Sequence, residues 1–101
     1  MMIKSKSDLL SNEFKVAAQV YECNEKGENI WFSKLVTLLG THMSAATVMK
    51  SLRMLSDWSV IRAEYGPTDK GRAGRLLFIA GESKSTIKEV YENFWNEKST
   101  I

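Results

Sequence analysis

The sequence is poor in the residues that build disulfide scaffolds, metal sites and membrane spans. Its 101 residues include one cysteine, Cys23, and one histidine, His42. A lone thiol cannot close a disulfide within the chain, and one cysteine with one histidine cannot supply a structural zinc site. No apolar run approaches the roughly 20 residues that cross a bilayer, and no secretory segment precedes the first predicted helix. We therefore expect a soluble, cytoplasmic protein that carries no metal or other cofactor.

The chain also lacks the length for a second domain and lacks a large net charge. With 44% hydrophobic residues, 101 residues suffice for one core, so residues 1–101 are predicted to form a single domain. The formal net charge is +2, but residues 34–75 carry seven Lys or Arg against three acidic residues. The flanking segments carry a small acidic excess. A local basic block is typical of a protein that binds a polyanion.

Catalytic and nucleotide-binding patterns are missing as well. Gly66, Gly71 and Gly74 do not match either phosphate-binding glycine fingerprint. A serine triad would need His42, which stands in a short turn where no cleft is expected. No sensor constellation or separate ligand-binding segment identifies a small-molecule effector. The sequence thus predicts a protein that is not an enzyme.

Hydrophobic periodicity predicts three helices in the first half of the chain. Apolar residues recur at steps of three and four over about residues 7–23, which indicates a first helix. Residues 30–32 are aromatic or β-branched and predict a short strand. Ser33 can cap a second helix over 34–39 that Gly40 closes, and Ser44 can cap a third that runs to about Asp57.

The second half of the chain predicts a hairpin and a last helix. Strands are expected at about residues 60–65 and 75–80, on either side of a glycine-rich loop at 66–74. The last helix is expected at about 86–97, where Thr86 and Glu89 match a capping box. The predicted order is therefore a helix, a short strand, two helices, one hairpin between residues 60 and 80, and a last helix.

This order of elements resembles the winged helix-turn-helix family. The helix-turn-helix would span about 34–57, and the glycine- and arginine-containing loop from Gly66 to Arg75 resembles the wings of small prokaryotic regulators of the MarR, ArsR and PadR kind. One departure is Ser59, which stands where these proteins usually have a glycine before the hairpin. The resemblance implies a mainly α fold with a small β-hairpin (α+β), in which a three-helix core carries the wing and a C-terminal helix. It also implies a transcriptional regulator that binds double-stranded DNA sequence-specifically.

The third predicted helix has the two faces that DNA binding requires. At about 100° per residue, Val48, Leu52 and Leu55 fall within one arc of roughly 60°, opposite Lys50 and Arg53. The basic face is predicted to enter the major groove, and the wing to contact the backbone or the minor groove. The predicted DNA-binding residues are Ser44, Ala46, Thr47, Met49, Lys50 and Arg53 of the helix, with Lys70, Arg72 and Arg75 of the wing.

An alternative function is open at this point, because winged helices also serve as protein–protein adaptors. Three methionines, Met43, Met49 and Met54, lie on or beside the third helix and could form an adaptable apolar surface. An adaptor of this kind would have no salt-sensitive affinity for DNA.

The first helix further predicts a homodimer. Its apolar residues spread over roughly 200° of the helix, more than one small domain is expected to cover. Pairing of the terminal helices would set two recognition helices about 34 Å apart and favour a palindromic DNA site. The alternative is that the first and last helices pack on each other within one chain. The predicted interface residues are Leu9, Val16, Val20, Tyr91, Phe94 and Trp95.

Overall fold

The computed structural model describes residues 6–68 and 71–96 of the chain. None of the helices in these two ranges is long and apolar enough to cross a membrane. The elements in chain order are a 3₁₀ turn η1 (Lys6–Leu9), helices α1 (Asn12–Glu25), α2 (Phe32–Leu38) and α3 (Ala45–Asp57), strands β1 (Ile61–Pro67) and β2 (Ala73–Ile79), a 3₁₀ turn η3 (Gly81–Ser83), helix α4 (Lys84–Val90) and a π-helical turn η4 (Tyr91–Trp95).

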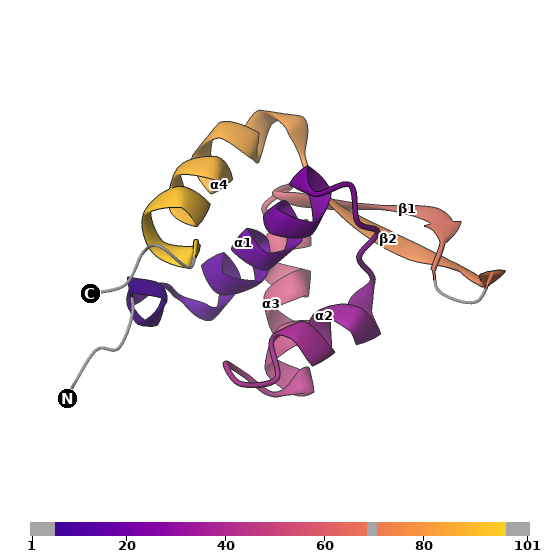
Figure 1. The fold of residues 1–101 in the computed structure, drawn as a ribbon, viewed down its shortest axis with the longest axis horizontal. Helices are drawn as coiled ribbons and strands as arrows, with labels where there is room; N and C mark the ends of the chain where they lie inside the picture. The colour runs from indigo at the N-terminus through magenta and orange to yellow at the C-terminus, as the bar shows by residue number, and fades with distance from the viewer. Residues whose placement is uncertain (1–5, 69–70, 97–101) are drawn as a thin grey trace.

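Helix α1 is the centre of the molecule. Figure 1 shows it between α4 on one side and α2 with α3 on the other, while the hairpin projects away from the helices. Val16, Ala17 and Val20 are fully buried, and Tyr21 is almost so. A helix that is apolar over most of its circumference must be covered on several sides, and here the same chain covers them.

The helix-turn-helix is formed by α2, a short turn and α3. Helix α2 begins after Trp31, which provides no side-chain cap, and α3 begins after Ser44, whose Oγ accepts a hydrogen bond from the Thr47 amide. Leu39 and Val48 are fully buried, so both helices are fixed to the core next to the turn. The predicted N-cap and the predicted end of α3 at Asp57 are both confirmed.

Strands β1 and β2 form a two-stranded antiparallel sheet in which Ile61 pairs with Ile79 and Pro67 with Ala73. The turn before β1 has unusual backbone geometry, because Ser59, two residues before the strand, lies in the left-handed region with φ 59°. This is the position where the family resemblance leads one to expect glycine, which has no Cβ penalty there. Serine therefore occupies a turn that imposes the conformation on it.

The hairpin is held to α1 by one side chain. Asn24 Nδ2 donates to the Leu77 carbonyl at 3.1 Å, and the Ile79 amide donates to Asn24 Oδ1 at 3.0 Å. The same strand also forms a backbone hydrogen bond with the segment between α1 and α2, in which the Leu77 amide donates to the Ile30 carbonyl at 2.8 Å. These contacts tie the outer edge of β2 to the helical core and so set the direction of the wing.

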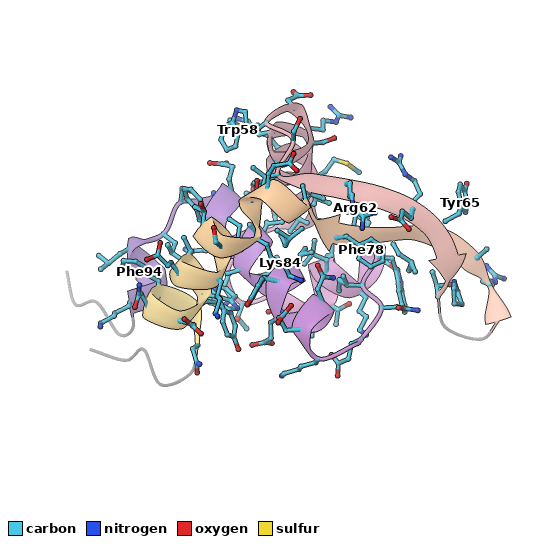
Figure 2. All side chains as sticks on the ribbon, turned by 90° about the horizontal axis from the view of Figure 1, so that it is seen from above. Trp58, Arg62, Tyr65, Phe78, Lys84 and Phe94 are labelled. Atoms are coloured by element: carbon cyan, nitrogen blue, oxygen red, sulfur yellow. The ribbon has the colours of Figure 1, made fainter. Side chains whose placement is uncertain are left out.

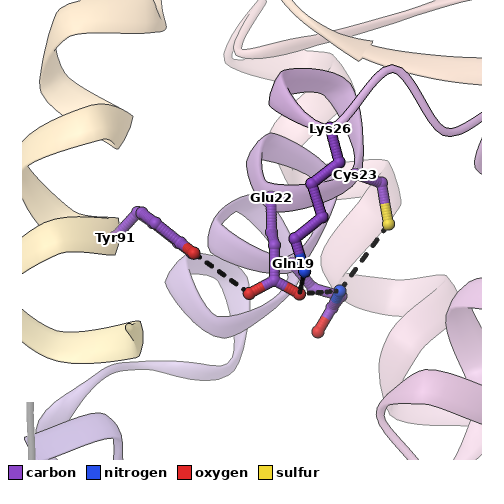
Figure 3. Close-up of polar contacts among 5 residues, drawn as sticks. All are labelled: Gln19, Glu22, Cys23, Lys26 and Tyr91. Atoms are coloured by element: carbon purple, nitrogen blue, oxygen red, sulfur yellow. Dashed lines mark hydrogen bonds and ion pairs between the residues drawn. The ribbon is translucent and has the colours of Figure 1, made fainter. Parts of the chain in front are cut away.

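A polar network joins the C-terminal turn to α1 (Figure 3). The Tyr91 hydroxyl donates to Glu22 Oε1 at 3.1 Å, and Gln19 Nε2 donates to the other Glu22 oxygen at 3.3 Å. The rings of Tyr21 and Tyr91 lie 5.4 Å apart. The C-terminal turn η4 and helix α1 are thus packed on each other within one chain.

Four local predictions are wrong at the element ends. Helix α1 begins at Asn12 rather than near residue 7, because Ser11 caps it and η1 precedes it. Residues 30–32 are not assigned to a strand, since only the Ile30 carbonyl joins the sheet and Phe32 already starts α2. Trp31 replaces Ser33 as the N-cap of α2. Helix α4 begins at Lys84, so Thr86 lies inside it and forms no capping box.

Candidate nucleic-acid interface

The outer face of α3 carries the predicted basic residues. Lys50 and Arg53 are exposed, as is Ala46 near the start of the helix. The opposite face is buried through Val48 and Leu55. The amphipathic arrangement expected from the helical wheel is confirmed, and it leaves two basic residues about one turn apart on the outer face of α3.

The Ser44 side chain caps the N-terminus of α3 by accepting a hydrogen bond from the Thr47 amide. The hydroxyls of Ser44 and Thr47 lie 3.1 Å apart, and Thr47 is half-buried. The first backbone bond of the helix runs from the Val48 amide to the Ser44 carbonyl at 3.0 Å. The N–H groups of Ala45 and Ala46 come before that bond and are oriented toward the helix start, where anions are favoured.

Two of the three predicted wing residues are described. Arg72 and Arg75 are exposed, whereas Lys70 lies outside the described residues. Arg75 pairs across the sheet with Tyr65, whose side chain is 81% exposed. Figure 2 shows Tyr65 toward the outer end of the hairpin. The sequence analysis did not select Tyr65, although it follows Ile61 by an even number of residues and so shares its face of the strand.

The opposite face of the hairpin holds an arginine that is already engaged. Arg62 pairs with Phe78 across the strands, and its guanidinium lies 5.0 Å from the centre of that ring (Figure 2). Arg62 also forms an ion pair with Glu64. These contacts restrain Arg62, whereas Arg75 forms no ion pair and no cation–π contact with any residue in 6–68 and 71–96.

Helix α3 and the hairpin enclose a hollow of about 520 Å³. Met49 and Arg53 line it from α3, and Arg62 and Arg75 line it from the strands. The sequence analysis placed Arg53 and Arg75 in two separate patches. The structure brings them to one hollow, which the sequence could not show because it depends on how the hairpin packs against α3.

Two of the residues predicted for the dimer interface lie in the core of one chain instead. Val16 and Val20 are 0% exposed within one chain, because α1 is covered on both sides by the chain's own helices. Tyr91 and Trp95 are half-buried against the core. The Trp95 ring lies tilted against the His42 ring, with ring centres 4.9 Å apart. Of the predicted set, Leu9 keeps the largest free surface, at 56% exposed.

The adaptor surface proposed from three methionines does not form as one patch. Met49 is 41% exposed, but Met43 packs against the core and Met54 is half-buried. Of these three methionines, Met49 alone is exposed.

Three titratable side chains have shifted pKa values. Burial, with smaller contributions from Glu25 and Glu92, raises the pKa of the Tyr21 hydroxyl. Burial, with a smaller contribution from Lys15, lowers the pKa of His42 below its usual 6.5. Burial raises the pKa of the Cys23 thiol. Within residues 6–68 and 71–96, no cluster of three or more His, Cys, Asp and Glu side chains could hold a metal ion.

A helix-turn-helix with a basic outer face, followed by an antiparallel hairpin, defines a winged helix-turn-helix fold, and the chain has this fold. Solved structures of the protein Pex are similar to it. The circadian clock associated protein Pex from Anabaena superposes with a TM-score of 0.66 at 16% identity, over 88% of this chain and 80% of Pex. Pex from Synechococcus sp. gives 0.56 at 19% identity, over 83% and 81%. No family model and no curated protein sequence matches the chain.

Proposed function

We propose that this protein binds double-stranded DNA and acts as a transcriptional regulator. The observation that carries the proposal is the outer face of α3, where Lys50 and Arg53 are exposed and Arg53 lines the same hollow as Arg75 of the hairpin. Cationic side chains on two adjacent elements fit a duplex, because one can enter the major groove while the other follows the backbone. The likeness to Pex supports the fold and thereby the placement of these elements.

Each group has a distinct proposed role. Ala46 and Thr47 at the start of α3 approach base edges with little bulk, and Met49 contacts the groove beside them. Lys50 and Arg53, one and two turns along, contact phosphates or guanines. Sequence specificity would come from the α3 residues.

The wing and the start of α3 would supply phosphate contacts. Arg72 and Arg75 are proposed to bind the backbone or the minor groove beside it, with Lys70 as a further contact. The amides at the capped start of α3, next to Ser44, would bind another phosphate. These contacts hold the protein on any sequence and orient α3 in the groove.

The test is fluorescence anisotropy with a labelled duplex of random sequence. The double variant Lys50→Ala and Arg53→Ala should weaken binding at least tenfold, because both side chains are exposed and carry no packing role. The matched control, Lys84→Ala with Lys88→Ala, removes two charges from α4 and should change the affinity for DNA by less than threefold. Equal losses in both double variants would show that the affinity reflects net charge and not the α3 face.

We also propose that the regulator acts as a homodimer, through apolar side chains near the N-terminal end of α1 that stay at least partly exposed in the described part of the chain. Leu9 is 56% and Phe14 is 37% exposed, and Phe94 is half-buried. A two-fold contact there would favour a palindromic DNA site. Sedimentation equilibrium should give twice 11.5 kDa at micromolar concentration, and Leu9→Lys should shift it toward one chain. A wild-type mass of one chain would refute the dimer.

A further inference from the structure

Tyr65 is the most exposed large apolar side chain in the described part of the chain, at 81%. Figure 2 shows it toward the outer end of the hairpin, away from the helices. Single exposed rings are common on protein surfaces, so the surroundings of Tyr65 decide what it can contact. Those surroundings include an exposed arginine directly across the sheet, and the backbone that carries the ring is held in place.

The face of the hairpin that carries Tyr65 is the face turned toward α3. Successive side chains of a strand point to opposite faces, so Tyr65 shares a face with Ile61 and Ala63, and both of these line the hollow beside α3. Directly across the sheet stands Arg75, which lines the same hollow as Arg53. The phenol therefore lies on the face that carries the proposed DNA contacts, one step further out along β1 than the hollow.

The strand next to Tyr65 is held by contacts on its outer side. Leu76 is 5% exposed and packs against Gly66, where a Cβ would lie 2.5 Å from Leu76 Cδ1. Beyond it, Asn29 Nδ2 donates to the Pro67 carbonyl at 2.9 Å, which ties the end of β1 to the segment between α1 and α2. A side chain on a fixed backbone is placed before it binds, so it loses less conformational freedom on binding.

We infer that Tyr65 reads A·T base pairs from the minor groove. The inference rests on the proposed function, in which α3 enters the major groove and the hairpin lies beside it. The floor of the minor groove presents acceptors at adenine N3 and thymine O2, and the phenol supplies one O–H donor. A G·C pair adds the guanine 2-amino group, which is itself a donor and occupies the place of the hydroxyl. The hairpin thus favours A·T pairs next to the bases that α3 contacts.

A tyrosine ring suits the interior of a groove better than it suits a phosphate. Its body is apolar and its tip is polar, and the minor groove, about 6 Å wide, offers base edges that accept hydrogen bonds. Phosphates are matched by the guanidiniums of Arg72 and Arg75, which are exposed on the same hairpin. The arginines hold the hairpin on any sequence, and the hydroxyl distinguishes one base pair from another.

The test compares duplexes whose major grooves present the same groups. One duplex alternates guanine and cytosine, and its counterpart has hypoxanthine in place of every guanine, which removes only the 2-amino group. Contacts of α3 with base edges in the major groove are the same in both. In fluorescence anisotropy, the wild-type protein should bind the hypoxanthine duplex roughly fivefold more tightly, the worth of one neutral hydrogen bond. In a second pair, replacing adenine with 2,6-diaminopurine in an alternating A·T duplex adds the amino group and should weaken binding by a similar factor.

Tyr65→Phe isolates the hydroxyl, because it keeps the ring and the side chain is too exposed to have a packing role. This variant should lose the preference within both pairs of duplexes. Arg72→Gln is the matched control on the same hairpin, and it should weaken binding to all four duplexes while keeping the preference. A preference that persists in Tyr65→Phe, or that Arg72→Gln abolishes, would assign the discrimination to an arginine and overturn the inference. Equal weakening of all four duplexes by Tyr65→Phe would place the phenol on a phosphate and overturn it as well.

The same duplexes separate this inference from the proposed function. If the wild-type protein bound none of the four, DNA binding would be refuted and this inference with it. If it bound both members of each pair equally, DNA binding would stand and the reading of A·T pairs by Tyr65 would be refuted.

Discussion

Replacing Asn24 with alanine should loosen the hairpin from the helical core. The substitution removes the bonds from Asn24 Nδ2 to the Leu77 carbonyl at 3.1 Å and from the Ile79 amide to Asn24 Oδ1 at 3.0 Å. Each bond contributes about 1 kcal/mol, and partly buried groups left without partners add to the loss. The expected destabilisation is therefore about 2 kcal/mol.

Urea unfolding followed by tryptophan fluorescence measures this change. With an m-value of about 1.5–2 kcal/mol/M for a domain of this size, a loss of about 2 kcal/mol lowers the midpoint by about 1 M. Because total stabilities of small domains are about 5–15 kcal/mol, the variant should remain folded in buffer. The DNA affinity should fall as well, since β2 sets the direction of the wing.

Asn29→Ala is the matched control. Its Nδ2 donates one exposed bond to the Pro67 carbonyl at 2.9 Å, so its loss should cost less than about 0.5 kcal/mol. If Asn24→Ala shifted the midpoint no more than Asn29→Ala does, the two bonds to β2 would not hold the hairpin, and the account of the wing would be wrong.

Three further predictions concern single residues. Ser59→Gly should raise stability by up to about 1 kcal/mol, because φ is 59° there, and a lower melting temperature would contradict it. Gly66→Ala should cost about 1–3 kcal/mol, since its Cβ would lie 2.5 Å from Leu76 Cδ1, and an unchanged urea midpoint would refute the clash. His42 has a pKa below 6.5 when folded, so the unfolded state binds its proton more readily and stability should fall as pH drops through 6.5. His42→Gln should remove that dependence; the same pH profile in the variant would contradict it.

The regular elements could be predicted from the sequence because they depend on local patterns. Alternation of Val48, Leu52 and Leu55 with basic residues fixes both faces of α3, and Ser44 fixes its start. The sequence did not predict the ends of other elements correctly where contacts with a neighbouring segment determine where the element begins. Residues 30–32, for example, were expected to form a strand. Only the Ile30 carbonyl accepts a hydrogen bond from the sheet, because Phe32 already begins α2.

The apolar breadth of α1 shows where sequence reasoning about the site reached its limit. Apolar residues on two sides of one helix indicate that both sides are buried. They do not indicate whether the same chain or a second copy packs against each side. In the structure α4 and η4 cover one side of α1 and α3 the other, so Val16 and Val20 belong to the core. The meeting of Arg53 with Arg75 in one hollow is likewise a property of packing between distant segments.

The most direct test of the central claim is the salt dependence of DNA affinity. Phosphate contacts by Lys50, Arg53, Arg72 and Arg75 would give a slope of about −3.6 in log affinity against log salt, or a loss of about 150-fold between 50 and 200 mM. The variant Arg72→Gln with Arg75→Gln should reduce that slope to about −1.8. A wild-type slope near zero, or a slope that the variant leaves unchanged, would contradict DNA binding by α3 and the wing.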